Sequence, residues 1–336
     1  MCASPRPARS RVALLIPLAA VLQPFTVNAQ SIDKPDVNAQ VKAIRSIEPA
    51  EFHESRKDQL SGGIPLGVPF RMATDSQGRI LISDPPLSLV HVFDVESGLR
   101  SQLNGDRNQR MLYPTYIAVD GSDNIYVSEP LLAAVLVFQP DGKFLRSIGG
   151  DHLYTPFGIA IDRSRRELYV ADHYRDEIQV YTLDGQFLRS IGSRGQGPGE
   201  LSDPTDIALH HGMLFVLDSG NARFLFFDTQ GAPKGVWAFG SDRVPATFAL
   251  DSNGNLYMVD LRSLGMLVLD AAGNPISAFD VLRPYGQPDQ ANRTPDVTSV
   301  APGKGDSMLA LRPSLKIDVI ELAKQPPPAP PQESKQ

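Results

Sequence analysis

The segment PTYIAVDGSDNIYVSE, residues 114–129, contains two strand signals separated by a polar turn. IAVD is short and built from small and β-branched residues, GSDN is rich in turn residues, and IYVS is aromatic and β-branched. These compositions favour strands that pack on pleated surfaces over helices. The segment therefore predicts two adjacent β-strands joined by a turn.

The same order of residues returns along the chain. Copies begin at Pro69 (PFRMATDSQGRILISD), Pro156 (PFGIAIDRSRRELYVAD), Pro204 (PTDIALHHGMLFVLD) and Pro245 (PATFALDSNGNLYMVD), and a weaker one at Pro295 (PDVTSVAPGKGDSMLALR). Consecutive units start 45, 42, 48, 41 and 50 residues apart. This period is typical of a four-stranded propeller blade, whereas a two-sheet sandwich predicts no fixed period.

Each unit continues into a third and a fourth strand. The third runs (LVHVFD, VLVFQ, EIQVYT, RFLFFD, MLVLD and KIDVIEL) are apolar at successive positions, which predicts burial on both faces. A turn glycine then opens the fourth strand at Gly98, Gly142, Gly185, Gly231 and Gly273. We therefore predict an all-β, six-bladed β-propeller of four-stranded antiparallel blades, starting near residues 69, 114, 156, 204, 245 and 295.

The sixth unit lacks a fourth strand, because KIDVIEL (Lys316–Leu322) runs directly into a proline-rich tail. KAIRSI (Lys42–Ile47) resembles the fourth-strand sequences KFLRSI (Lys143–Ile148) and QFLRSI (Gln186–Ile191). A bare sheet edge recruits other chains. We therefore predict that residues 41–48 pair with the last strand and close the ring.

The two ends of the chain carry different signals from the repeats. Residues 1–29 contain three arginines, an apolar stretch from Val12 to Val21, and small residues before Gln30. This order predicts a signal peptide cleaved near Ala29 and a periplasmic or extracellular protein, a retained anchor being the alternative. The propeller then spans residues 30–324, and residues 325–336 form a disordered, proline-rich tail.

Composition excludes several functions. The single cysteine, Cys2, lies within the predicted signal peptide, so the mature chain has no disulfide, thiolate metal site or cysteine nucleophile. Removing residues 1–29 leaves 29 basic and 38 acidic residues, which moves the net charge from −6 to −9. Such a surface disfavours nucleic acid. We expect a monomer without a transmembrane segment that binds an unidentified protein, peptide or small molecule.

One unit carries a family motif. In VLDSGNARFLFFDTQG (Val216–Gly231), Asp218, Asn221 and Arg223 form a D-x-x-N-x-R pattern, and a glycine-rich linker, residues 192–208, precedes the unit. These features, over about residues 41–322, resemble the NHL-repeat family of six-bladed β-propellers. The resemblance implies the fold, but this architecture hosts binding scaffolds and enzymes alike.

Strand direction places the loops between second and third strands on the same face as the long connections between blades, here called the long-loop face. We expect a binding site there, at the mouth of the central channel. The residues two after each opening proline border that mouth: Arg71, Tyr116, Gly158, Asp206, Thr247 and Val297. The resembling family commonly has glycine here, so four unlike polar side chains indicate a specific pocket, unless they cap strand ends.

A second ring of residues ends the second strands. Its members are Asp84, Glu129, Asp172, Asp218, Asp260 and Arg312. Five acids and one base could attract a cation or a basic ligand. The alternative is structural, because a repeated aspartate at a strand end often accepts hydrogen bonds from its own loop.

An enzymatic function of the kind found in related propellers would require residues that bind a metal ion. Propellers related to the NHL family include a zinc lyase and calcium-dependent lactonases. His152 and His173, with Asp172, are the histidine-containing candidate site, and Asp84, Asp206, Asp218 and Asp260 offer the oxygen ligands that calcium prefers. The leading hypothesis is a non-catalytic binding scaffold with no assigned cofactor. The alternative is a metal-dependent lyase or lactonase-type hydrolase with a carboxylate-lined channel.

Overall fold

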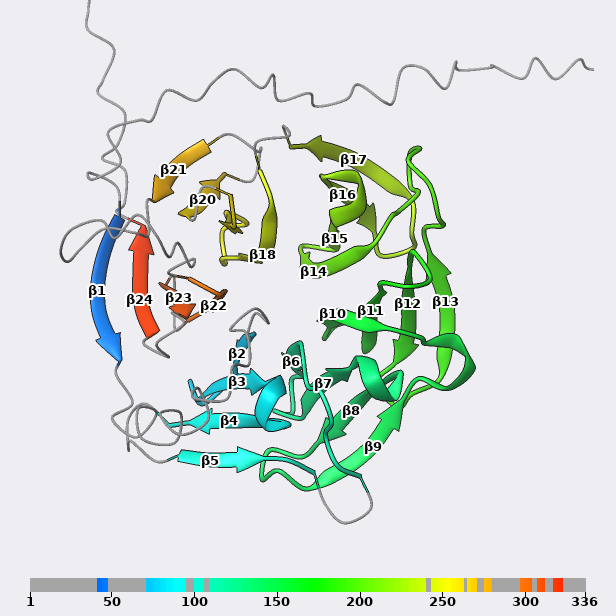
Figure 1. The fold of residues 1–336 in the computed structure, drawn as a ribbon, viewed down its shortest axis with the longest axis vertical. Helices are drawn as coiled ribbons and strands as arrows, with labels where there is room; N and C mark the ends of the chain where they lie inside the picture. Colours follow the sequence, from blue (N-terminus) through cyan, green and yellow to red (C-terminus); the bar gives the residue numbers. More distant parts are fainter. Residues whose placement is uncertain are drawn as a thin grey trace, which may run out of the picture.

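The computed structural model shows six four-stranded antiparallel sheets arranged as a ring (Figure 1). It describes residues 41–47, 71–94, 100–105, 109–239, 243–262, 265–270, 275–279, 297–303, 307–311 and 317–322. The predicted all-β, six-bladed propeller is therefore confirmed. The predicted signal peptide, the proline-rich tail and Arg312 lie outside the described residues.

The strands follow the predicted order within each blade, from the centre outwards. Blade 1 contains β2 (Met72–Thr74), β3 (Ile80–Asp84), β4 (Leu89–Phe93) and β5 (Arg100–Leu103). Blade 2 contains β6 (Ile117–Val119), β7 (Ile125–Glu129), β8 (Ala134–Phe138) and β9 (Phe144–Ile148). Blade 3 contains β10 (Pro156–Asp162), β11 (Glu167–Asp172), β12 (Glu177–Thr182) and β13 (Phe187–Ile191).

The remaining blades repeat this order. Blade 4 contains β14 (Pro204–His210), β15 (Met213–Asp218), β16 (Arg223–Asp228) and β17 (Pro233–Ala238). Blade 5 contains β18 (Pro245–Leu250), β19 (Leu256–Asp260), β20 (Gly265–Leu269) and β21 (Pro275–Phe279). Blade 6 contains β22 (Ser299–Pro302), β23 (Ser307–Leu311), β24 (Ile317–Leu322) and β1 (Val41–Ile47). Short 3-10 turns, η3 (Pro85–Leu87), η4 (Pro130–Leu132), η5 (Gly150–His152) and η6 (Ser219–Asn221), lie in loops.

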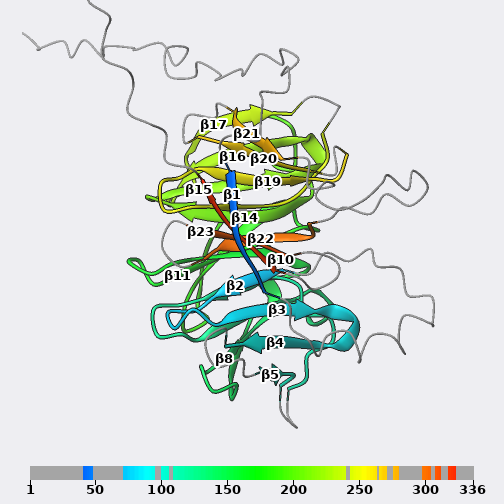
Figure 2. The same cartoon turned by 90° about the vertical axis from the view of Figure 1, so that its left-hand side faces the viewer.

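The outermost strand of blade 6 comes from the other end of the chain. β1 lies antiparallel to β24, with Ala43 opposite Ile320 and Ile47 opposite Ile317. Figures 1 and 2 show this strand at the rim of the ring, in the position that β5, β9 and β13 occupy in their own blades. The two ends of the propeller therefore share one sheet.

The core lies between blades and not within a single sheet. Each pair of neighbouring blades encloses one apolar cluster, six clusters in the described residues. The cluster between blades 6 and 1 joins Leu309 and Ile317 to Ile80 and Phe93. All five residues of both β4 and β8 are buried, as expected for third strands packed on two sides.

The turn glycines before the fourth strands are required by backbone conformation. Gly142, Gly185 and Gly231 have φ of 89°, 97° and 92°, a region that other residues enter only at a cost. A Cβ on Gly231 would also lie 2.9 Å from Ile191 Cγ1 of the preceding blade. Gly98 and Gly273 lie outside the described residues.

Within the described part of the chain, no helix has the length and apolar character needed to cross a membrane.

Candidate functional site

The first predicted ring converges on the central channel. Arg71, Tyr116, Asp206 and Thr247 all line one cavity of about 190 Å³ and are at most 6% exposed. In blades 4 and 5 the ladder register shifts between the opening proline and Asp206 or Thr247. Such bulges redirect a side chain, and here they occur at the ring positions.

Arg71 and Tyr116 form a contact across neighbouring blades. The Arg71 Nη2 group donates to the Tyr116 hydroxyl at 2.7 Å and to the carbonyl of Ala246 at 2.9 Å. The guanidinium carbon also lies 4.4 Å from the centre of the Tyr116 ring, within range of a cation–π interaction. Arg71 therefore connects blades 1, 2 and 5 across the channel.

Asp206 and Thr247 form the opposite part of this ring. Asp206 Oδ2 accepts from the Thr247 hydroxyl at 2.7 Å and from the amide of Phe248 at 3.3 Å, while Oδ1 accepts from the amide of Ile207. Burial raises the pKa of Asp206 to about 6, although the charge of Arg71 opposes this shift. A perturbed acid beside a guanidinium in a cavity is a feature common at functional sites.

The other two ring positions have packing roles. A Cβ at Gly158 would lie 2.7 Å from both the Cα of Asp206 and the amide nitrogen of Ile207, so only glycine allows blades 3 and 4 to approach this closely. Val297 is buried in the cluster between blades 5 and 6. The sequence analysis assigned all six positions to one ring. It did not show that Gly158 makes a packing contact between blades and does not line the pocket.

The cavity extends along the inner strands away from the long-loop face. Beyond the polar ring its lining is largely apolar: Met72, Ile117, Ile159, Ile207, Ala208, Leu209, Phe248, Ala249, Leu250, Val300, Ala301 and Pro302. These residues follow the ring positions along the inner strands, towards the face of tight turns. The four polar groups therefore lie at one end of this cavity, and several of the apolar residues that follow them, such as Met72 and Ile117, also belong to the apolar clusters between blades.

The described members of the second predicted ring end the second strands and bond to the adjoining loops. Asp84, Glu129, Asp172, Asp218 and Asp260 are at most 2% exposed, and none of them lines the channel cavity. Their carboxylates accept hydrogen bonds from backbone amides of nearby loops. This arrangement agrees with the structural alternative, in which a repeated acid at a strand end accepts hydrogen bonds from its own loop.

Four of these acids hold the connection that enters their own blade. Glu129 accepts from the Leu112 amide at 3.1 Å, Asp172 from Tyr154 at 2.7 Å, and Asp260 from Val244 at 2.8 Å. In blade 4, Asp218 accepts from the Ser202 amide at 2.6 Å. The same carboxylate position thus fixes the backbone just before each of these four blades.

Glu129 differs from the aspartates in its electrostatic surroundings. Both of its oxygens accept amide hydrogen bonds, from Leu112 and Tyr113. Asp172, Asp218 and Asp260 each have an arginine within 4 Å, whereas the contacts that influence Glu129 are these two amides. Burial raises the pKa of Glu129 to about 7.

The D-x-x-N-x-R motif forms one connected network. Asp218 Oδ2 accepts from Asn221 Nδ2 at 2.9 Å and from Arg223 Nε at 2.7 Å. Asn221 and Arg223 then donate to carbonyls of residues 195–200, within the glycine-rich linker. The motif therefore ties the linker to blade 4.

The described histidines do not assemble a metal site. His152 stacks on Phe187 with ring centres 3.8 Å apart, and His173 Nε2 lies 3.8 Å from Asp203 Oδ1. Among the described residues, no group of three or more His, Cys, Asp or Glu side chains could hold a metal ion. Asp84, Asp206, Asp218 and Asp260 are distributed among separate local networks.

Exposed apolar side chains, which the sequence analysis missed, occur on the long-loop face of blades 2, 3 and 5. Six lie in loops that strand direction assigns to this face, and we call them the apolar rim: Leu112, Leu131, Tyr154, Tyr174, Val244 and Leu261. They are 41% to 67% exposed. The Tyr154 and Tyr174 rings stack with centres 5.0 Å apart. The sequence could have pointed to them through their positions, because each lies in a connection between blades or in a loop after a second strand.

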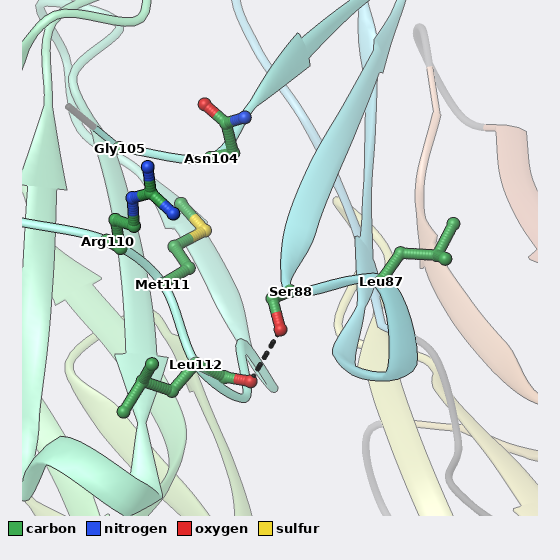
Figure 3. A pocket seen from close by; sticks show the side chains of 7 residues that line it. All are labelled: Leu87, Ser88, Asn104, Gly105, Arg110, Met111 and Leu112. Carbon is green, nitrogen blue, oxygen red and sulfur yellow. Dashed lines mark hydrogen bonds between the residues drawn. The ribbon is translucent and has the colours of Figure 1, made fainter. Parts of the chain in front are cut away.

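A larger hollow lies between blades 1 and 2 on the same face. It measures about 590 Å³ and is lined by Leu87, Ser88, Asn104, Gly105, Arg110, Met111 and Leu112 (Figure 3). Ser88 donates its hydroxyl to the Leu112 carbonyl at 2.8 Å, which joins the two sides.

Comparisons with known proteins agree with the fold. The model of the DUF5128 family, described as a 6-bladed beta-propeller, matches residues 159–264. No curated protein matches the sequence.

Solved structures of diverse proteins are similar over much of the chain. A streptogramin B lyase is 15% identical, with a TM-score of 0.57, over 78% of this chain and 95% of its own. A catalytically inactive virginiamycin B lyase from Staphylococcus aureus with quinupristin is 11% identical, with a TM-score of 0.57, over 76% and 95%. A chain of a nidogen/laminin complex is 21% identical, with a TM-score of 0.54, over 64% and 81%. At these identities the likeness shows the fold alone: the chain is a six-bladed β-propeller.

Proposed function

We propose that this propeller is a non-catalytic scaffold that binds a protein partner on its long-loop face. The apolar rim carries the proposal. Six of the eight exposed large apolar side chains in the described residues lie on this one face, and the other two, Leu145 and Leu188, lie on outer strands. Exposed apolar groups gathered on one surface are typical of interaction sites.

The rim is also held in place, which favours binding over random exposure. The amides of Leu112, Tyr154 and Val244 are bonded to the buried carboxylates of Glu129, Asp172 and Asp260. A backbone that is already held in place loses little conformational entropy when a partner binds. A tyrosine pair is a suitable anchor, since tyrosine is enriched at interface cores.

The test compares a rim variant with a matched surface variant. Tyr154→Ser with Tyr174→Ser removes the stacked pair, and Leu145→Ser with Leu188→Ser removes the exposed leucines of β9 and β13. Crosslinked complexes from the producing cells should contain a partner that the wild type and the leucine variant retain and the tyrosine variant loses. A partner retained equally by all three chains would refute the proposal.

A metal-dependent lyase or lactonase-type hydrolase is the second candidate. Asp206, with its pKa raised to about 6, lies beside Arg71 and Tyr116 in the channel, a set of groups that could take part in proton transfer. Metal analysis of the purified protein, followed by Asp206→Asn in any activity found, separates the two candidates. A stoichiometric ion would favour the enzyme.

We also propose that the protein is secreted or periplasmic and belongs with the NHL-repeat propellers. The basic and apolar start of the chain supports export. The Asp218, Asn221 and Arg223 network supports the kinship. Amino-terminal sequencing of the protein from culture fractions should begin at Gln30, and a chain that retains Met1 in the cytoplasm would contradict export.

A further inference from the structure

The guanidinium of Arg71 is buried with unused donors. Its side chain lines the channel cavity and the residue is 6% exposed. Nη2 uses its two N–H groups on Tyr116 and Ala246. Among the residues that the structure describes, Nε and Nη1 have no hydrogen-bond partner. Since a guanidinium carries five N–H groups, three of them remain available.

We propose that the central channel binds a small carboxylate, whose oxygens accept hydrogen bonds from Arg71 and Tyr116. A charge buried with unmet donors is unfavourable unless a partner of opposite charge reaches it. The Tyr116 hydroxyl accepts from Arg71, so its own proton remains to be donated. Charge-assisted bonds from guanidinium to carboxylate are among the stronger hydrogen bonds.

Asp206 does not take the place of this ligand. Its two oxygens accept from the Ile207 amide, the Thr247 hydroxyl and the Phe248 amide. No hydrogen bond between Asp206 and Arg71 occurs, although the two charges interact across the ring. The carboxylate of Asp206 therefore leaves the Nε and Nη1 donors of Arg71 unused.

The size and lining of the cavity limit the ligand. A volume of about 190 Å³ holds about six water molecules at about 30 Å³ each. Beyond the polar ring, the residues that line the cavity are of apolar types, among them Met72, Ile117, Ala208 and Val300. These features fit a carboxylate with a short aliphatic chain, either a free acid or the end of a peptide. This site is distinct from the apolar rim, so it does not depend on the proposed protein partner.

Titration calorimetry at constant ionic strength tests the assignment. Sodium acetate, butyrate and hexanoate are compared with butyramide and inorganic phosphate on the full mature chain. We expect butyrate to bind and butyramide to show no heat of binding. A tripeptide with a free carboxyl end and its amidated form then distinguish a peptide end from a free acid.

Variants locate the bound carboxylate. Arg71→Gln should weaken butyrate binding by about tenfold or more, because a hydrogen bond to a charged group is lost. Tyr116→Phe keeps the ring and the buried charge and should weaken binding about threefold to tenfold. Arg194→Gln, a side chain that is 75% exposed, should leave binding unchanged. If no carboxylate binds at up to about 10 mM, a dissociation constant only about tenfold weaker than 1 mM, or if Tyr116→Phe binds as the wild type does, the assignment is wrong.

Discussion

Single residues in this propeller act through the contacts that a neighbouring blade imposes on them. Gly158 adjoins the backbone of Asp206, and Arg71 reaches Ala246 in blade 5. Neither contact is local in the sequence. A residue two positions after a blade proline therefore has a role that depends on another blade of the ring.

Gly158→Ala should destabilise the fold and disturb the channel. The added Cβ would lie 2.7 Å from backbone atoms of blade 4, which cannot move as freely as a side chain. Overpacking of this kind costs about 1–3 kcal/mol. Urea unfolding measures the change. Gly121→Ala is the control, since its Cβ would have only a side-chain atom, Arg163 Cδ, at 3.9 Å, and equal losses in both variants would exclude a steric cause.

Glu129 should make stability depend on pH near neutrality. Its pKa is about 4.5 when unfolded and about 7 when folded, so the folded chain holds the proton more tightly. This stabilisation is complete below the unfolded value and is lost as pH rises through about 7. Over the whole titration of Glu129, the free energy of unfolding falls by roughly 3 kcal/mol. About 2–3 kcal/mol of this fall occurs between pH 5 and pH 8.

Glu129→Gln tests this effect because glutamine does not ionise. The free energy of unfolding of the wild type should fall between pH 5 and pH 8 relative to that of the variant. Asp184→Asn, at a side chain that is 73% exposed, should follow the wild type. Parallel curves for wild type and Glu129→Gln would show that Glu129 keeps an ordinary pKa.

At the scale of elements, the end of the second strand determines the shape of the connection before it. β11 ends in Asp172, whose oxygens accept from the amides of Tyr154 and Thr155. β15 ends in Asp218, which accepts from Ser202 and from the motif residue Arg223. A repeated acid therefore gives the loops of different blades a common anchor.

Asp172→Ala should loosen the connection that carries Tyr154. Two part-buried amides would lose their acceptor, and each unsatisfied group costs up to about 1–3 kcal/mol. We expect a loss of about 2–4 kcal/mol in urea unfolding, together with faster amide exchange at Tyr154 and Thr155. Asp184→Ala removes an exposed carboxylate paired with Arg146 and should change stability by less than about 1 kcal/mol. Unchanged exchange at Tyr154 would mean that Asp172 does not hold the rim.

At the scale of the whole molecule, the ring is closed by apolar packing between blades 6 and 1, and strand pairing within blade 6 joins the two ends of the propeller. The apolar cluster between β4 of blade 1 and β24 of blade 6 joins the first and last blades. β1 covers the outer edge of β24 with a seven-residue strand. An uncovered edge would present unpaired backbone groups to other chains.

Deletion of residues 41–47 should expose the edge of β24. We expect a lower melting temperature and, in gel filtration, a shift of the protein towards larger species. Deletion of residues 325–336, the proline-rich segment after the last strand, is the control and should change neither. A monomeric elution profile with an unchanged melting temperature after removal of residues 41–47 would show that the strand is dispensable.

The sequence by itself determined the number of blades and the order of strands, and it predicted which positions along the chain form the two rings. These follow from local features: a period near 45 residues, turn glycines such as Gly142 with positive φ, and a proline at each blade entry. Such signals depend on the chain's own backbone and on apolar burial, which repeat from blade to blade.

Only the tertiary structure decided what the ring residues contact. Arg71 and Ala246 are 175 residues apart, yet they are hydrogen bonded, and the repeat carries no information about such pairs across the channel. The structure also showed that four buried polar groups line the channel, whereas the acids at the ends of second strands support the loops. The physical reason is that closing a ring fixes distances between blades that no segment of sequence encodes alone.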